Sequence, residues 1–371
     1  MEQTEKFFTH RVITTALVIV AILGGILYYF YYVRVNQMNI VSEFNNAYNS
    51  ALAMLVNGST DVTTTIAELQ KLYNTAPNKE TQAKVEQSLV TSLFRRNVGD
   101  DRSMAIALVE KTAADTESTP RSRAIALTLL ASLVRNEDDS FFRQYFSGTT
   151  LSKYLPPDGV QADSLNIAIK MFKDAEAIYP TPYAEYYIAY VYTLLIRAEE
   201  LTVTGGSANI EDMARAVQTY IKKGDETIRT DANYVSSTLA YFYYMRAFSL
   251  SNSARILGNM TVEERETAYK DALAKISVLT TDPYVIDALF KTKFRYAVLL
   301  LNNTKGRESD IQIILSDFGI LNPELSSDEI VSDSFKSIQR TNSAITKKSI
   351  AGLADISPEF KGFLLKLDLK L

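Results

Sequence analysis

Residues 164–198 read SLNIAIKMFKDAEAIYPTPYAEYYIAYVYTLLIRA, and this stretch decides the fold. Within it, Ala168, Phe172 and Ala175 recur at spacings of four and three, which places them on one face of a helix. Pro180 follows five residues after Ala175 and ends that helix, because proline has no backbone N–H with which to continue the hydrogen bonds. The small alanines let a second helix approach closely, and the Phe172 ring fills the space between the two.

A second helix follows the turn at Pro180. Ile188, Ala189 and Tyr192 supply its apolar face at spacings of one and three. Two short helices joined by a turn cannot bury their apolar faces alone, so such a hairpin has to stack on neighbouring hairpins. The stretch therefore predicts an all-α fold built from repeated helix–turn–helix units, and no strand pattern of convincing length occurs elsewhere.

The same spacings return in other parts of the chain. They are found at Thr65, Leu69, Leu72 and Pro77 for the first pattern, and at Leu239, Ala240 and Tyr243 for the second. A further unit begins at Ala272, with Ile276 and Leu279 behind it. The units are degenerate, but they keep the alternation of short helices and short turns that indicates an array.

This arrangement resembles the tetratricopeptide repeat, whose second helix carries Ala, Phe or Tyr, Ala and Pro at the spacing seen from Ala168 to Pro180. The resemblance implies an α-solenoid over residues 58–301, in which the first helix of each unit lines a concave, ligand-facing surface. Residues 302–371 then form a C-terminal helical capping region with a tail. The Phe-, Pro- and Gly-containing segment 138–159 is an irregular insertion over the stack or, alternatively, a linker.

An uncharged run precedes the predicted array. Residues 12–33 read VITTALVIVAILGGILYYFYYV, which is long enough as a helix to span a hydrocarbon core of about 30 Å. Tyrosines crowd its C-terminal end, as in an interfacial aromatic belt. The run lacks the shorter apolar core and the small-residue cleavage site of a signal peptide. It therefore predicts an uncleaved, single-pass transmembrane anchor, and residues 34–57 continue its helical pattern toward the array.

The basic residues that flank this run indicate an orientation. Lys6 and Arg11 precede the run, whereas Arg34 is the one basic residue close behind it. This balance favours a cytoplasmic flank at residues 1–11 and an extracytoplasmic body at the cell membrane. Ala21 and Gly25 form a small-xxx-small pair, which would let two anchors pack into a homo-oligomer; the alternative is a flexible point that faces lipid.

The composition excludes several classes of site. The chain has no cysteine and one histidine, His10, so disulfides, thiolate metal sites and histidine-based triads are excluded within one chain. A formal charge of −4 gives no basic footprint for nucleic acid. Glycine-rich phosphate loops are missing, and adjacent acidic pairs such as Glu199 and Glu200 suit a solvated helix face better than paired catalysis. We therefore expect a non-catalytic protein without cofactor or metal.

The resemblance also assigns a candidate binding surface. If Ala189 and Ala240 each take the small-residue position of a first helix, six tyrosines face one groove across neighbouring units. These are Tyr183, Tyr186, Tyr190, Tyr234, Tyr241 and Tyr244. Tyrosine suits recognition because it combines a rigid apolar ring with a hydrogen-bonding tip. The alternative is that the tyrosines pack as ordinary core. The family's clamp for a peptide carboxylate, built from Lys, Arg and Asn, has no recognisable counterpart.

The preferred interpretation is a membrane-anchored scaffold that holds a protein or peptide partner at the extracytoplasmic membrane face. Its layout is similar to that of anchored tetratricopeptide proteins that assist secretion or envelope assembly, which is an analogy of layout alone. Two other classes stay open. One is a small-ligand protein whose aromatic groove takes a glycan or a lipid, and the other is a purely structural subunit of a membrane complex.

Overall fold

The computed structural model describes most of the chain as helix. The described residues are 28–51 without 30 and 37, 62–202, 208–230, 239–279, 285–303, 305–316 and 343–366. Within these ranges every regular element is helical, and no strand is present. The prediction of an all-α fold is therefore confirmed for the described part of the chain.

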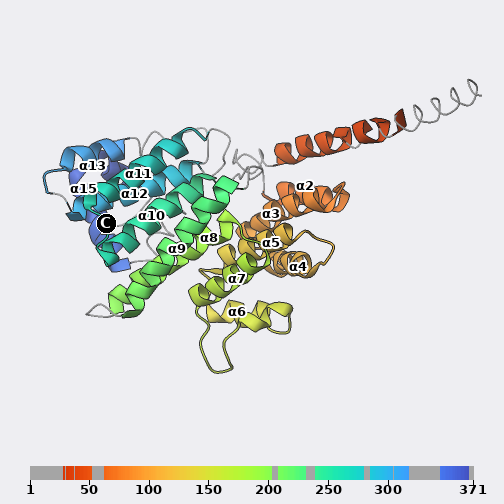
Figure 1. The fold of residues 1–371 in the computed structure, drawn as a ribbon, viewed down its shortest axis with the longest axis horizontal. Coiled ribbons are helices and arrows are strands. Elements are labelled where there is room, and N and C mark those ends of the chain that lie inside the picture. Colours follow the sequence, from red (N-terminus) through yellow and green to blue (C-terminus); the bar gives the residue numbers. More distant parts are fainter. Residues whose placement is uncertain are drawn as a thin grey trace, which may run out of the picture.

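The helices follow one another through short connections, as Figure 1 shows. In chain order they are α2 (Val62–Thr75), α3 (Lys79–Arg96), α4 (Asp101–Ala114), α5 (Pro120–Val134), α6 (Asp139–Phe146), the 3-10 helix η1 (Thr150–Tyr154), α7 (Ser164–Ile178), α8 (Pro182–Thr202), α9 (Ala208–Thr230), α10 (Leu239–Leu257), α11 (Val262–Ser277), α12 (Val285–Asn303), α13 (Glu308–Leu315), α15 (Ser343–Ile356) and α16 (Pro358–Lys366). Residues 28–51 are also helical where they are described.

Polar side chains at the helix ends explain several of these boundaries. The Asp163 carboxylate accepts hydrogen bonds from the backbone N–H groups of Leu165 and Asn166 and so caps the start of α7. At α11, Thr261 and Glu264 form a reciprocal capping box. Each such cap satisfies N–H groups that have no partner inside the helix and contributes about 1 kcal/mol.

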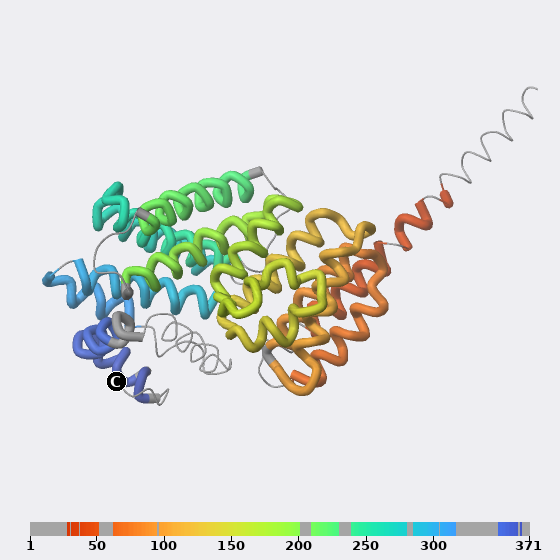
Figure 2. Tube along the Cα trace, turned by 90° about the horizontal axis from the view of Figure 1, so that it is seen from below, coloured from red at the N-terminus to blue at the C-terminus, as the bar shows by residue number. Residues whose placement is uncertain are grey.

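The packing repeats along the chain. Each helix from α2 to α5 and from α7 to α12 contacts the next one in this series, α5 contacts α7, and α12 contacts α13. Alternate helices touch as well, because α3 contacts α5, α5 contacts α8, α8 contacts α10 and α10 contacts α12. We call α3, α5, α8, α10 and α12 the central row. The two orders of contact give the repeat-like packing of an α-solenoid, which Figure 2 shows as a continuous stack.

The hairpin predicted from residues 164–198 is present as α7 and α8. Ala168, Phe172 and Ala175 are fully buried, and the Phe172 ring stacks on Tyr187 of α8 at a centroid distance of 5.3 Å. Small residues therefore bring the two helices together around one aromatic ring. This part of the prediction is confirmed in detail.

The segment 138–159 is more regular than its composition indicates. It contains α6, which Asp138 caps by accepting from the N–H of Phe141, and the 3-10 helix η1. Phe141, Phe142 and Phe146 are buried on one side of α6, and their rings pack edge to face. The segment is therefore partly helical where an irregular course was expected, because phenylalanines at helical spacing outweigh the neighbouring Gly and Pro.

The membrane anchor in the predicted fold class needs a correction. Among the described residues, no helix is long and apolar enough to cross a membrane. A span needs about 20 apolar residues, whereas the described part of the predicted anchor is limited to residues 28–29 and 31–33, and polar side chains such as Arg34 and Glu43 follow within the helix. The rest of the predicted anchor at residues 12–33, with Ala21 and Gly25, lies outside the described residues. We therefore describe the fold as an all-α helical array.

The C-terminal helices close one end of the stack. α15 contacts both α12 and α13, and the Phe360 ring of α16 lies 6.4 Å from the Phe294 ring of α12. The region expected at residues 302–371 to be helical contains α13, α15 and α16. Residues 317–342 of that region lie outside the described residues.

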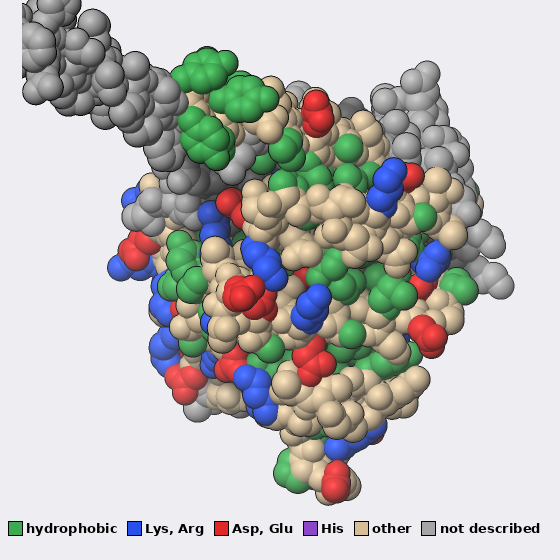
Figure 3. All heavy atoms as spheres, turned by 90° about the vertical axis from the view of Figure 1, so that its right-hand side faces the viewer, with side chains coloured by type: hydrophobic (Ala, Val, Ile, Leu, Met, Phe, Trp, Pro, Cys, Tyr) green, Lys and Arg blue, Asp and Glu red, His purple; other side chains and the backbone are tan. Residues whose placement is uncertain are grey.

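The outer surface carries charge of both signs. On the face in Figure 3, acidic and basic side chains are intermixed, with hydrophobic side chains scattered between them. Several ion pairs on the outside join neighbouring helices, such as Lys223 with Glu176 and Arg255 with Glu200. The more unusual arrangement of charge is inside the stack.

Candidate functional site

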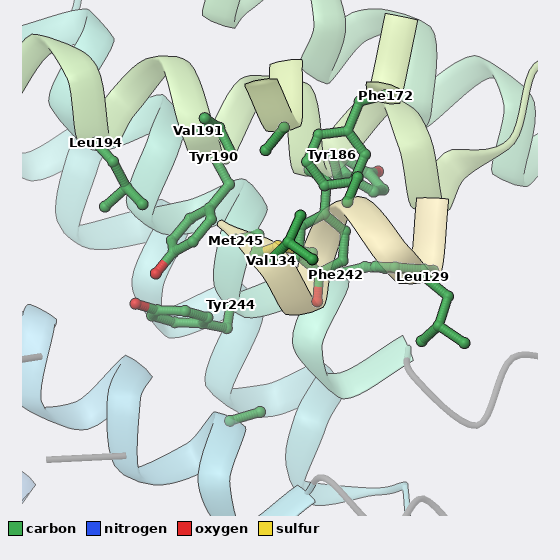
Figure 4. Close-up of a cluster of buried hydrophobic side chains, with 14 of the residues drawn as sticks. Leu129, Val134, Phe172, Tyr186, Tyr190, Val191, Leu194, Phe242, Tyr244 and Met245 are labelled. Atoms are coloured by element: carbon green, nitrogen blue, oxygen red, sulfur yellow. The ribbon is translucent and has the colours of Figure 1, made fainter. Parts of the chain in front are cut away.

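Three of the six tyrosines predicted to face a groove are core residues. Tyr186, Tyr190 and Tyr244 are at most 8% exposed. Figure 4 shows Tyr190 of α8 and Tyr244 of α10 among buried apolar side chains, with one ring above the other. The sequence left two alternatives open, and the burial of these three is what the packed-core alternative requires. They offer no open surface to a partner.

The other three tyrosines are placed differently. Tyr183 of α8 and Tyr241 of α10 are half-buried. The Tyr183 ring lies 5.0 Å from Tyr187 and 5.7 Å from Phe242. Tyr234 lies outside the described residues. A role in binding remains a prediction for these positions.

Tyr186 has a structural role that the sequence did not indicate. Its hydroxyl donates to Asp225 of α9 at 2.6 Å, and the same carboxylate accepts two hydrogen bonds from Arg246 of α10 at 2.7 and 2.8 Å. Although burial alone raises the pKa of Asp225, the hydrogen bonds from Arg246 and Tyr186 hold it below its ordinary value. Gly224 leaves room for the ring, since a Cβ there would lie 3.0 Å from Tyr186. The three side chains fasten α8, α9 and α10 together.

Four cationic side chains lie among the aromatic rings of the central row. Arg135 follows α5 as its C-cap, Arg197 belongs to α8, and α12 supplies Lys291 and Arg295. We call these residues, with the side chains around them, the tyrosine–cation cluster. Its other members are Tyr187 and Tyr190 of α8, Tyr241, Tyr244 and Phe248 of α10, and Asp287 of α12.

Within the cluster, Lys291 is paired with a carboxylate and a hydroxyl group. Its Nζ lies 2.8 Å from Asp287 Oδ2 and also donates to the Tyr241 hydroxyl. The same Nζ is 4.6 Å from the centre of the Tyr241 ring. Burial alone lowers the pKa of Lys291, but Asp287 together with Tyr244 and Tyr190 outweighs burial and raises this pKa above its ordinary value. Lys291 and Asp287 therefore form a charged, neutralising pair inside the protein.

Arg295 is held in a different way. It is 6% exposed, and its guanidinium carbon lies 4.7 Å from the centre of the Phe248 ring. Its Nε has no hydrogen-bond acceptor among the described residues. Arg197 approaches the same Phe248 ring at 5.7 Å. The face of the Phe248 ring therefore packs against the guanidinium groups of both arginines.

The crowding of cations also affects Arg197. Its pKa is lowered to about 10, chiefly by burial; the positive charges of Arg295 and Arg255 act in the same direction, and Tyr269 and Glu200 oppose them. Arg135 adds another cation above Tyr187 and Tyr190, at 5.6 and 5.8 Å from the ring centres. The cluster thus brings several cations against aromatic rings, and its carboxylate, Asp287, is paired with Lys291.

Sequence reasoning missed these cations, although one signal was present. Asp287, Lys291 and Arg295 recur at every fourth position, so they lie on one face of α12. That face also carries the apolar residues Ala288 and Phe294, which are fully buried. Charges that recur within an apolar stripe are unusual, because isolated buried charges are costly. The pattern therefore identifies α12 as unusual, but it does not predict which side chains its charges contact.

Comparisons with known proteins identify no family for this chain. No protein-family model matches the sequence, and no curated protein or solved structure is significantly similar to it. Within the described ranges, no group of three or more His, Cys, Asp or Glu side chains is arranged to hold a metal ion. The interpretation of the site therefore depends on the cluster itself.

Proposed function

We propose that this chain is a tetratricopeptide-like, non-catalytic scaffold that holds a protein or peptide partner along its central row. One observation carries the proposal. The tyrosine–cation cluster draws its side chains from four successive helices of that row, α5, α8, α10 and α12. The half-buried members of the cluster, among them Arg135, Arg197 and Tyr241, thus follow one another across several repeats, as the binding residues of helical-repeat proteins do.

The residue types at the margin of the cluster support the same function. Arg135, Tyr183, Arg197 and Tyr241 are half-buried, so each offers part of its side chain to the outside. Tyrosine and arginine are enriched among the residues that contribute most to protein–protein affinity. Their rings and guanidinium groups are already fixed by packing against one another, which lowers the entropy that binding would cost.

The tetratricopeptide likeness is the finer part of the proposal. It draws support from α7, where Ala168, Phe172 and Ala175 are buried at the spacing that the family uses in a second helix. It also draws support from Ala189 of α8 and Ala240 of α10, which are 1% and 0% exposed. Small residues at these positions let successive helices pack closely.

Site-specific photocrosslinking tests the proposal. The full chain would carry p-azidophenylalanine, which resembles tyrosine in shape, at Tyr183 or at Tyr241. Matched controls would carry it at Val278, which follows α11, and at Ile313 of α13, which are 72% and 70% exposed and lie off the central row. Circular dichroism would verify that each variant keeps its helical content.

We expect one defined partner to crosslink at Tyr183 and Tyr241 and not at the control positions, in cells that express the chain at its natural level. The same partner crosslinking at Val278 or Ile313 alone would place binding on the outer helices and contradict the proposal. Absence of any crosslinked partner at Tyr183 and Tyr241 would contradict it as well.

A further inference from the structure

We propose that Glu185 of α8 is a protonation switch. With a proton on its carboxyl group it holds the C-terminal end of α9, residues 222–230, against α8, and without that proton it releases this end. The inference goes beyond the proposed function, which requires no dependence on pH. It depends on three observations: the depth at which the carboxyl group lies, the charges around it and the kind of contacts that hold this end of α9.

The first observation is that Glu185 is buried although it carries an ionisable group. It is 2% exposed, and its Oε2 atom has no hydrogen-bond partner among the described residues. A buried carboxylate is costly when one of its oxygens has no donor, whereas a protonated carboxyl group is neutral and supplies a donor of its own. The position of Glu185 therefore favours the protonated form.

The second observation concerns the charged side chains that face Glu185. Glu176 of α7 and Glu226 of α9 act on it as like charges, and Lys223 of α9 acts on it as an opposite charge. Lys223 is already paired with Glu176, because its Nζ lies 2.5 Å from Glu176 Oε1. An ionised Glu185 would therefore have to share this ammonium group with another carboxylate.

Two other helices packed against α8 carry cations that have partners of their own. On α10, Arg246 makes two hydrogen bonds to Asp225 of α9. Arg135, the C-cap of α5, lies over two tyrosine rings of α8. Because both cations are engaged elsewhere, neither replaces the proton on Glu185.

A hydrogen bond joins the Glu185 carboxyl group to the Thr227 hydroxyl of α9. That hydroxyl has one hydrogen to donate, and the carbonyl oxygen of Lys223, 3.0 Å away, also accepts from it. A protonated Glu185 resolves this competition, because it can donate its own hydrogen to the Thr227 oxygen. The proton therefore contributes directly to the contact between α8 and α9.

These surroundings move the pKa of Glu185 toward neutrality. It is raised to about 7, chiefly by burial; Glu176 and Glu226 act in the same direction, whereas the hydrogen bond with Thr227 and the charge of Lys223 oppose them. The ordinary pKa of a glutamate carboxyl group is 4.5. A released Glu185 therefore loses its proton at a pH at which the held form still keeps it.

The third observation is that different contacts hold the two halves of α9, which lies along α8 (Figure 1). The first half shares an apolar cluster with α8, to which it contributes Ile210, Met213, Ala214, Val217 and Ile221. The second half is held mainly by the polar side chains of Lys223, Asp225 and Thr227, which contact α7, α8 and α10. Loss of a polar contact therefore loosens the second half and leaves the first half in place.

Release of this end affects the central row through Asp225. Its carboxylate accepts hydrogen bonds from Tyr186 of α8 and from Arg246 of α10, so it links two helices of that row. Movement of residues 222–230 away from α8 breaks these hydrogen bonds as well. The switch therefore weakens the polar link between α8 and α10 as the pH rises.

Hydrogen exchange of backbone amides in the full chain, followed by mass spectrometry, tests the inference. Exchange in residues 222–230 would be compared with exchange in residues 208–221 of the same helix from pH 5 to pH 8, after correction for the intrinsic pH dependence of the exchange reaction. We expect the equilibrium constant for opening of residues 222–230 to rise by about tenfold to a hundredfold between pH 5 and pH 7 and then to level off. Residues 208–221 should show no comparable rise.

Variants connect the pH dependence to Glu185. Glu185→Gln keeps the shape of the side chain but does not titrate in this range, so exchange of residues 222–230 should stay slow at every pH. Glu211→Gln is the matched control, because Glu211 is exposed on the first half of α9 and pairs with Arg215. It should leave the pH dependence unchanged. Glu86 is present in both variants, so its own titration does not account for a difference between them.

A second variant keeps the inference testable if Glu185→Gln does not fold. Glu176→Gln removes a neighbouring negative charge and frees Lys223 to interact with Glu185. Both changes favour the ionised form of Glu185, so the pH at which the opening constant levels off should fall.

Three outcomes would overturn the inference. The first is exchange of residues 222–230 that does not change with pH in the unaltered chain. The second is an equal pH dependence in residues 208–221, which would indicate opening of the whole helix. The third is a pH dependence in Glu185→Gln, or in Glu176→Gln if the former does not fold, that equals that of the unaltered chain. The crosslinking experiment above has a separate readout, so the switch and the partner-binding function can fail independently.

Discussion

The inward faces of α7 and α12 carry different kinds of side chain. On α7 the face is apolar, with Ala168, Phe172 and Ala175 fully buried. On α12 the corresponding face carries Lys291 and Arg295 at 7% and 6% exposure. An apolar face stabilises the fold by burial alone, whereas a charged face needs a partner for each charge. The comparison shows that α7 is held by apolar packing alone, whereas α12 also depends on how its buried charges are paired.

The largest expected effect comes from removing the apolar packing of α7. Phe172→Ala would leave a cavity between α7 and α8 where the ring now stacks on Tyr187. We expect a loss of about 3–5 kcal/mol in the free energy of unfolding. Urea denaturation followed by circular dichroism measures it. Phe172→Leu, which keeps most of the volume, should cost clearly less; an equal loss in both variants would argue against a packing role.

The next largest effect comes from removing the carboxylate of the ion pair on α12. Asp287→Asn would leave Lys291 buried without its carboxylate, and the asparagine would retain only a neutral acceptor. We expect a loss of about 2–3 kcal/mol, below the cost of leaving a buried charge with no partner at all. Denaturant unfolding gives the value. The double variant Asp287→Asn with Lys291→Met should recover part of the loss, and no recovery would contradict the pairing.

A buried carboxyl group in the N-terminal half makes stability depend on pH. Glu86 of α3 is 3% exposed, its carboxylate accepts from Thr112 of α4 at 2.5 Å, and burial raises its pKa to about 7. The folded state therefore keeps a proton that the unfolded state releases near pH 4–5. Stability conferred by protonated Glu86 is complete below that range and declines as the pH rises to about 7.

Replacement of Glu86 tests whether its carboxyl group causes this pH dependence. Glu86→Gln should remove the decline and stabilise the protein at pH 8 by on the order of 2 kcal/mol. Unfolding midpoints measured from pH 5 to pH 8 would show it. Glu110→Gln, at a partly exposed position on α4 that bonds Thr150, serves as the control. An unchanged pH slope in Glu86→Gln would refute the assignment.

The smallest effect concerns the link among α8, α9 and α10. Tyr186→Phe removes one hydrogen bond to Asp225 and leaves both bonds from Arg246 in place. We expect a loss of about 1 kcal/mol. A double-mutant cycle with Asp225→Asn measures the coupling between the two side chains. Coupling near zero would show that the ring packing of Tyr186, and not its hydroxyl, holds the helices together.

The residues of α7 show why part of the fold was predictable. Local spacing of Ala168, Phe172 and Ala175 determines which side of the helix is buried, so the hairpin follows from a short stretch of sequence. The position of α6 did not follow, because Gly148, Pro156, Pro157 and Gly159 behind it resemble the residues of a loop. The anchor predicted at residues 12–33 has no counterpart among the described helices.

The cluster was harder to predict for a different physical reason. Arg135, Arg197 and Arg295 come from helices far apart in sequence, and only the alternate contacts of the central row bring them together. Tyrosine is also ambiguous, since its ring suits the core and its hydroxyl suits a surface. Periodicity therefore identified Tyr186 and Tyr190 without revealing that both lie inside.

The order of contacts in the central row determines how binding at one helix changes the stability of the others. Since α12 reaches α5 through α10 and α8, stabilisation at one end must pass from helix to helix. Protection of backbone amides against hydrogen exchange would then be greatest in α10 and α12 and decrease through α8 and α5 toward α3. The array would respond to occupancy as a graded chain of neighbours, with its N-terminal helices opening as freely as before.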